Sequence, residues 1–176
     1  MSVDWTDYHP FDPGVDGPVE LLSRADAKRA YTLCMDSRPT RRVELAGLLS
    51  RNGLTLSESD GDIQTLNEWY IDEMEPDDRD PGRLMPLWYA VTNDVALFLG
   101  DEMIARNPGL RWEFFIWGKR SSHYQRHVIM GFPDAQHKYS VDIDTLVAQV
   151  GYRAIAGRSS ADDRHRFLVW VRPRST

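Results

Sequence analysis

A chain of 176 residues with a formal net charge of −6, 41% hydrophobic and 27% charged residues has the composition of one ordinary globular domain. Its longest apolar runs, residues 87–91 and 95–99, are far shorter than the ~20 residues that cross a bilayer, and its acidic start lacks a secretory signal. The single cysteine, Cys34, excludes an intramolecular disulfide, and its apolar neighbours favour a buried thiol over a reactive one. We therefore expect a cytoplasmic protein that makes no membrane contact.

Residues 1–18 are predicted to form an irregular arm, because prolines and glycines interrupt any regular pattern there. Three aromatic residues, Trp5, Tyr8 and Phe11, lie within this segment. Rings of this size favour burial, so we expect the arm to pack onto the single domain that spans residues 1–176.

The next part of the chain predicts three helices. Apolar spacing favours helices over residues 19–36 and 40–51, with a break before Pro39 because the residue preceding a proline avoids helical geometry. Gly53 suits the end of the second helix. A third helix is expected over residues 63–74, since its apolar residues fall on one stripe.

The strongest helical pattern covers residues 86–106. Pro86 suits the first turn, and the Asn-Pro-Gly sequence at 107–109 ends the pattern. Apolar residues go almost all the way round this helix, which predicts a central position surrounded by other elements. Gly100 costs about 1 kcal/mol relative to alanine in a helix, so we expect a neighbouring group to pack closely against it.

Beyond residue 109 the apolar period changes from 3.6 to 2. This alternation predicts two strands, over residues 110–117 and 123–132, that pair as a hairpin. A short strand is expected at 139–142, and the segments 152–156 and 166–171 are predicted to form a last strand pair.

A short helix through residue 150 is expected to precede that last strand pair. Helices early in the chain and strands late in it favour an α+β fold. The predicted architecture packs the N-terminal helices around the central helix and a C-terminal antiparallel sheet of three to five strands.

The acidic segment, residues 58–80, holds ten acidic residues and one basic residue, Arg79. Aromatic anchors within a charged surface are typical of protein-binding faces. The alternative is a solvated loop that aids solubility. The candidate partner-binding residues are Trp69, Tyr70, Asp72, Glu73, Glu75, Asp77 and Asp78.

Three side chains are candidates for acid–base catalysis: His127, Asp142 and Glu102. Asp142 and Asp144 form a carboxylate pair, for which the alternative is capping of the following helix. Glu102 lies near apolar positions that would perturb its ionisation, although an ion pair with Arg106 is its alternative role. Together they would suit a small hydrolase or ligand-binding enzyme with a cleft between the sheet and the central helix.

The hairpin turn gathers basic and aromatic residues and is a candidate anion-binding site, with a charged sheet end as the alternative. His123 and His127 have the spacing of a helical zinc site, but on a strand that spacing spans roughly 13 Å, so we predict no metal site. No phosphate-loop or dinucleotide motif indicates a cofactor, and scattered basic residues give little support for nucleic-acid binding. The candidate anion-binding residues are Lys119, Arg120, His123 and Arg126.

The segments 88–100 and 108–113 combine an apolar helix, a late glycine and a following Pro-Gly-Leu-Arg-Trp-Glu sequence. This pattern resembles small bacterial α+β proteins, some of which occur as immunity or accessory partners in toxin systems. The resemblance covers residues 86–132 and transfers no functional residue. It implies, together with the acidic segment, a non-enzymatic immunity-type protein that binds a basic protein partner.

Overall fold

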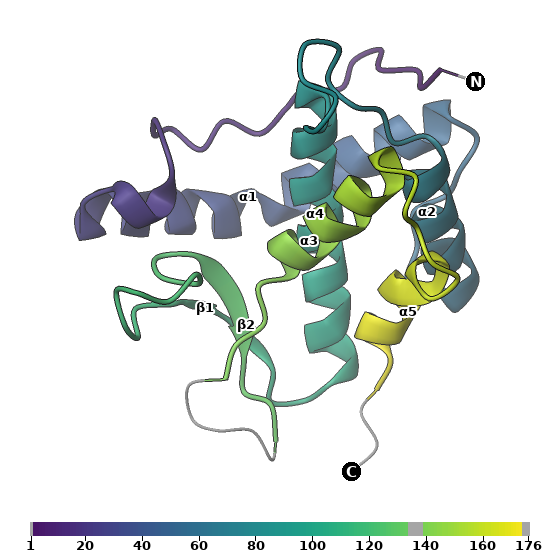
Figure 1. Ribbon diagram of the computed structural model, residues 1–176. Helices are drawn as coiled ribbons and strands as arrows, with labels where there is room; N and C mark the ends of the chain where they lie inside the picture. The colour runs from purple at the N-terminus through teal and green to yellow at the C-terminus, as the bar shows by residue number, and fades with distance from the viewer. Residues whose placement is uncertain (1, 134–138, 174–176) are drawn as a thin grey trace.

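The computed structural model describes residues 2–133 and 139–173. Within these residues it is an α+β fold, in which five α-helices accompany one two-stranded antiparallel sheet (Figure 1). None of the described helices is long and apolar enough to cross a membrane. In chain order the elements are η1 (Val19–Leu21), α1 (Arg24–Arg51), α2 (Asp60–Asp72), α3 (Pro86–Arg106), β1 (Arg111–Phe114), β2 (His127–Met130), α4 (Ile143–Ile155), η2 (Asp163–His165) and α5 (Arg166–Val171).

The helix α3 runs through the middle of the molecule with the bounds that the sequence predicts. It packs against α1, α4 and α5, and Figure 1 shows α1 crossing behind it and α4 in front. Trp88, Val91, Val95 and Leu99 on α3 are fully buried. The apolar pattern that surrounds this helix therefore corresponds to neighbours on several sides.

Gly100 lies directly beneath the ring of Trp112 from β1. A Cβ atom at this position would lie 2.1 Å from Trp112 Cζ2, far closer than atoms can approach. The indole Nε1 also donates a 2.8 Å hydrogen bond to Asp101 Oδ1 on the same helix. The close approach expected at this glycine is thus confirmed, and it fixes the sheet against α3.

The break predicted at Pro39 is wrong, because α1 continues through it for 28 residues. A proline within a helix leaves the carbonyl four residues earlier without its amide partner. Here Arg38 Nε donates a 3.0 Å hydrogen bond to Met35 O, the carbonyl concerned. Ser37 Oγ similarly donates to Cys34 O at 2.8 Å. Side chains next to the proline thus replace the lost backbone bond.

The last predicted strand pair is also wrong, since both segments are helical. The helix α4 continues through Gly151 to Ile155, and residues 166–171 form α5. Gly151 allows α4 to lie close to α2, because a Cβ there would lie 3.0 Å from the Tyr70 hydroxyl. Phe167 of α5 is fully buried, and its backbone amide donates to Asn67 Oδ1 of α2 at 2.9 Å.

Among the residues that the structure describes, the sheet accordingly has two strands, so the predicted three to five strands are not confirmed. Arg111 pairs with Met130 and Phe114 pairs with His127 in an antiparallel register. The segment predicted as a short strand contributes one isolated bridge, between Val141 and Ile129. This bridge brings the start of α4 to the edge of β2, where the candidate site lies.

The N-terminal arm, residues 2–18, runs alongside α1 and reaches the core (Figure 1). Val3 and Tyr8 are buried, and Trp5 packs edge-to-face on Trp88 with 5.3 Å between ring centroids. The backbone amide of Asp4 donates to the Asn52 side chain at 2.8 Å. The arm therefore supplies part of the wall of the pocket described next.

Candidate functional site

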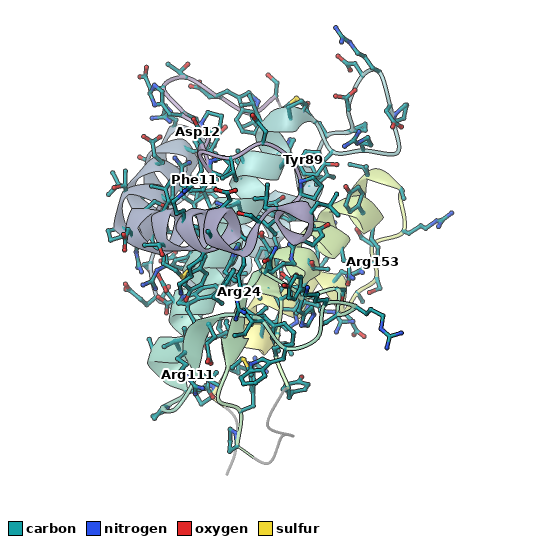
Figure 2. All side chains as sticks on the ribbon, turned by 90° about the vertical axis from the view of Figure 1, so that its left-hand side faces the viewer. Phe11, Asp12, Arg24, Tyr89, Arg111 and Arg153 are labelled. Carbon is teal, nitrogen blue, oxygen red and sulfur yellow. The ribbon has the colours of Figure 1, made fainter. Side chains whose placement is uncertain are left out.

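A pocket of about 420 Å³ lies where the arm, α1, α3, the hairpin and the start of α4 meet. Its volume falls within the range of small-molecule sites. Figure 2 labels Phe11 of the arm and Tyr89 of α3, two aromatic residues that line the pocket. The lining residues are Pro10, Phe11, Pro13, Val19, Ala27, Ala30, Tyr31, Cys34, Pro86, Tyr89, Ala90, Asn93, Gln125, Arg126, His127 and Asp144.

Gln125 positions the polar side chains of this pocket. It adopts a left-handed backbone conformation, with φ of 62°, two residues before β2 begins. Its buried amide donates to Val19 O at 2.7 Å and to Leu22 O at 3.1 Å, which ties the hairpin to the segment before α1. The next two residues, Arg126 and His127, line the pocket as a consequence.

The polar end of the pocket is an ionic cluster of four side chains from the hairpin and α4. Arg126 Nε donates a 2.6 Å hydrogen bond to Asp142 Oδ2, and Arg126 Nη2 lies 3.9 Å from Asp144 Oδ2. His127 Nε2 lies 3.5 Å from the same Asp144 oxygen. The structure thus brings together His127 and Asp142, two catalytic candidates from the sequence, with Asp144 of the predicted carboxylate pair and Arg126, a candidate anion-binding residue.

Asp142 has a structural role within this cluster. Its carboxylate accepts hydrogen bonds from the Thr145 backbone amide at 3.0 Å and from Thr145 Oγ1 at 2.8 Å, besides the one from Arg126. It is therefore the N-cap of α4, as the capping alternative predicted. Both carboxylate oxygens of Asp142 already accept hydrogen bonds, and one of these bonds holds Arg126 in place. Asp144 is therefore the carboxylate that lines the pocket.

Asp144 and His127 each present a polar atom that is not satisfied by the fold. Asp144 Oδ1 and His127 Nε2 are both buried and make no hydrogen bond with the described residues. Burial opposes ionisation of Asp144, but His127 and Arg126 outweigh it and lower the pKa of this carboxyl. Burying an ionised oxygen without a hydrogen-bond donor costs free energy. Such unpaired buried atoms are therefore rare in stable folds.

The rest of the wall is largely apolar, with small residues on α1 and α3 and aromatic rings around them. Tyr89 is held in place by a 2.6 Å hydrogen bond between its hydroxyl and that of Tyr152. Tyr31 packs against Phe114 with 5.4 Å between ring centroids. These contacts fix the rings before any ligand enters.

Cys34 also lines the pocket, and burial raises the pKa of its thiol to about 12. A thiol with this pKa remains protonated at neutral pH and is a poor nucleophile. Among the described lining residues there is no serine or threonine.

Glu102, the third catalytic candidate, is not a lining residue of this pocket. Its buried carboxylate lies 3.5 Å from Arg42 Nη1 and 3.7 Å from Arg106 Nε, between α1 and α3. Burial raises the pKa of Glu102, against the effect of the Arg42 charge. The ion pair with Arg106 was its predicted alternative, and the geometry fits that structural role.

The acidic segment does not present the two predicted aromatic anchors to solvent. Tyr70 is fully buried and shares a 2.7 Å hydrogen bond with Thr92, while Trp69 packs on Trp88 with 5.2 Å between ring centroids. Both rings point inward because they lie on the α2 face that covers the core.

The acidic side chains of this segment are partly engaged within the fold. Asp72 pairs with Arg164 at 2.7 Å, and Asp77 accepts two backbone hydrogen bonds inside its own loop. Asp78 is exposed, and Glu73 and Glu75 are half-buried. Asp72 and Asp77 therefore stabilise the local structure of this segment.

The four candidate anion-binding residues do not form one site either. Lys119 and Arg120 are exposed in the turn, whereas Arg126 is bonded to Asp142 in the pocket. His123 Nδ1 shares a 2.8 Å hydrogen bond with Ser140 Oγ. Lys119 and Arg120 are therefore in solvent, whereas Arg126 is bound within the pocket, and the residues do not form one anion-binding site.

Within residues 2–133 and 139–173, no group of three or more His, Cys, Asp or Glu side chains could hold a metal ion. No protein-family model, curated protein or solved structure matches the chain. The pocket is therefore interpreted from its own geometry and chemistry.

Proposed function

We propose that this chain is a small-molecule-binding protein whose ligand occupies the 420 Å³ pocket between the arm, α1, α3 and the hairpin. The observation that carries the proposal is the buried, unbonded pair of atoms Asp144 Oδ1 and His127 Nε2 at the polar end of an otherwise apolar pocket. Buried polar atoms in folded proteins nearly always have partners. A ligand with an apolar body and one hydrogen-bonding group would supply them.

The protein-binding function expected from the acidic segment has less support. Its aromatic anchors Trp69 and Tyr70 lie against the core, and Asp72 is paired with Arg164. An immunity-type role remains a prediction from the sequence. The pocket offers a more specific arrangement of groups, so it is the site to test first.

The test is a fragment screen with a variant whose pocket is filled. Ala90 of α3 lines the pocket, so Ala90→Phe places a ring inside it. Ala105→Phe is the matched control, because it lies on the exposed side of the same helix. Binding is followed by ¹H–¹⁵N NMR on the wild type and both variants, with thermal unfolding to establish that each is folded.

We expect fragments to shift the amide signals of lining residues in the wild type and in Ala105→Phe but not in Ala90→Phe. The proposal is overturned if a broad fragment set leaves these signals unmoved in the wild type. It is equally overturned if Ala90→Phe, folded, binds the same fragments with unchanged affinity.

A further inference from the structure

The polar end of the pocket holds more carboxylates than guanidinium groups. The ionic cluster contains one guanidinium, from Arg126, and two carboxylates, from Asp142 and Asp144. The fourth group is His127, whose Nε2 lies 3.5 Å from Asp144 Oδ2. Buried carboxylate oxygens in proteins are normally paired, and Asp144 Oδ1 makes no hydrogen bond with the described residues, so it is open to a cationic donor.

The guanidinium of Arg126 is already committed within the cluster. Its Nε bonds Asp142 at 2.6 Å, while its Nη2 is 3.9 Å from Asp144 Oδ2, beyond hydrogen-bond distance. Asp144 Oδ1 therefore remains an acceptor without a donor. A protonated amine suits this acceptor, because it carries one positive charge and several N–H donors.

The walls of the pocket favour the same chemistry. Phe11, Tyr31 and Tyr89 line it together with small aliphatic side chains. Aromatic faces attract cations through the quadrupole of the ring, and more strongly where water is excluded. An anion would instead approach the unbonded oxygen of Asp144, and like charges at that distance repel.

We infer that the ligand of this pocket is a cationic amine with an aromatic or aliphatic body, its ammonium group seated against Asp144 Oδ1. This inference rests on the proposed ligand-binding function and specifies the class of ligand. It assigns Asp144 as the residue that selects the charge of the ligand. Arg126 and Asp142 act as positioning residues that hold the hairpin and α4 around it.

The experiment compares three probes of similar size that differ in one group: 2-phenylethylamine, 2-phenylethanol and phenylacetate. Affinities are measured by NMR titration of the wild-type chain at pH 7 and millimolar probe concentrations. We expect the amine to bind at least about 10-fold more tightly than the alcohol, as for a charge-assisted hydrogen bond in a buried site. Phenylacetate is expected to show no saturable binding.

Asp144→Asn removes the charge while keeping the shape of the side chain. We expect it to weaken 2-phenylethylamine about 10-fold and to change 2-phenylethanol by less than about 3-fold. Asp142 remains the cap of α4 in this variant, so the helix is retained. Asp36→Asn, an exposed acid on α1, is the control for a long-range charge effect and should leave the amine affinity unchanged.

The inference is overturned if the alcohol or phenylacetate binds as tightly as the amine, if the amine does not bind, or if Asp144→Asn leaves amine affinity unchanged. The two proposals fail in different ways. Binding of the alcohol or the acid that Ala90→Phe abolishes would retain a ligand pocket and reject a cationic ligand. Binding that Ala90→Phe does not affect would reject the pocket itself.

Discussion

The hydroxyl of Tyr8 donates a 2.6 Å hydrogen bond to Oδ2 of Asp94, a carboxylate of the central helix α3. Arg41 of α1 bonds the same carboxylate through Nε at 2.8 Å and Nη2 at 2.6 Å. Asp94 is 2% and Arg41 is 6% exposed, so the arm, α1 and α3 meet at a buried ion pair. Pro10 and Phe11 lie two and three residues after Tyr8, and this anchor therefore also holds a wall of the pocket.

Replacing Arg41 by methionine is expected to lower the free energy of unfolding by about 3–5 kcal/mol, because it leaves Asp94 buried without its counter-charge. Burial already raises the pKa of Asp94 against the opposing effect of Arg41. Urea denaturation at pH 7 measures the loss. The double variant Arg41→Met/Asp94→Leu, which removes both charges, should recover a substantial part of it.

The control for Arg41 is Arg29→Met in the same helix. Arg29 pairs with Asp26 three residues away, and both side chains are exposed. An exposed pair contributes about 0–1 kcal/mol, so this variant should remain close to the wild type. Equal losses for Arg29→Met and Arg41→Met would contradict a special role for the buried pair.

Gly100→Ala is expected to destabilise the fold by about 1–3 kcal/mol, although alanine is about 1 kcal/mol better than glycine in a helix. The reason is the ring of Trp112, 2.1 Å from the new Cβ and held by its bond to Asp101. Thermal and urea unfolding measure the change. In a Trp112→Leu background the same substitution should become neutral or stabilising.

Gly47→Ala in α1 is the matched control for Gly100→Ala. A Cβ at Gly47 would meet Arg51 Nη1 at 3.5 Å, which is an ordinary contact. This substitution should therefore show the helix propensity alone and stabilise the protein by up to about 1 kcal/mol. Destabilisation at both glycines would indicate that the Trp112 contact is not the cause.

The features that the sequence predicted well depend on local signals. The bounds of α3 follow from Pro86 and the Asn-Pro-Gly sequence after Arg106, and the cap at Asp142 follows from the preference of aspartate for helix starts. The hairpin follows from the change of apolar period, although its strands are shorter than predicted. Each of these signals lies within a few residues of its effect.

The errors arise where tertiary contacts override local preference. Pro39 is accommodated because Arg38 bonds the carbonyl that the proline leaves free. The apolar run at 166–171 is compatible with either a strand or a helix, and its docking on α2 through Asn67 decides in favour of the helix. Neither contact is visible in the spacing of apolar residues.

The candidate site could be predicted only in part for the same reason. His127 and the Asp142–Asp144 pair were recognisable as chemistry-bearing residues. These side chains lie close together only because the Val141–Ile129 bridge and the hydrogen bonds from Gln125 to the segment before α1 hold their segments in place. Part of the apolar wall comes from the arm and α1, whose lining residues lie more than 70 residues earlier in the chain than the hairpin.

Cys34 is expected to react very slowly with iodoacetamide in the native protein. Burial raises its pKa to about 12, against an ordinary value of 9.0, so the thiolate fraction at pH 8 falls by about 10³-fold. Mass spectrometry follows alkylation in buffer and in guanidinium chloride, where the unfolded chain is the control. Similar rates in both conditions would show that the thiol is not buried.

Asp163 should make the stability of the protein depend on acid pH. It is 2% exposed and accepts hydrogen bonds from Arg153 and Ser160, and Arg153 lowers the pKa of its carboxyl well below the usual range. Because the pKa of Asp163 is lower in the folded state than its ordinary value near 4, its carboxylate stabilises the folded protein at neutral pH. That contribution to the free energy of unfolding is lost progressively as the pH falls below about 5. Asp163→Asn should therefore cost about 2 kcal/mol at pH 7 and progressively less towards pH 3, in urea unfolding series at each pH. Asp162→Asn, its exposed neighbour, should cost less than about 0.5 kcal/mol throughout, and a pH-independent cost at Asp163 would mean that its charge does not contribute.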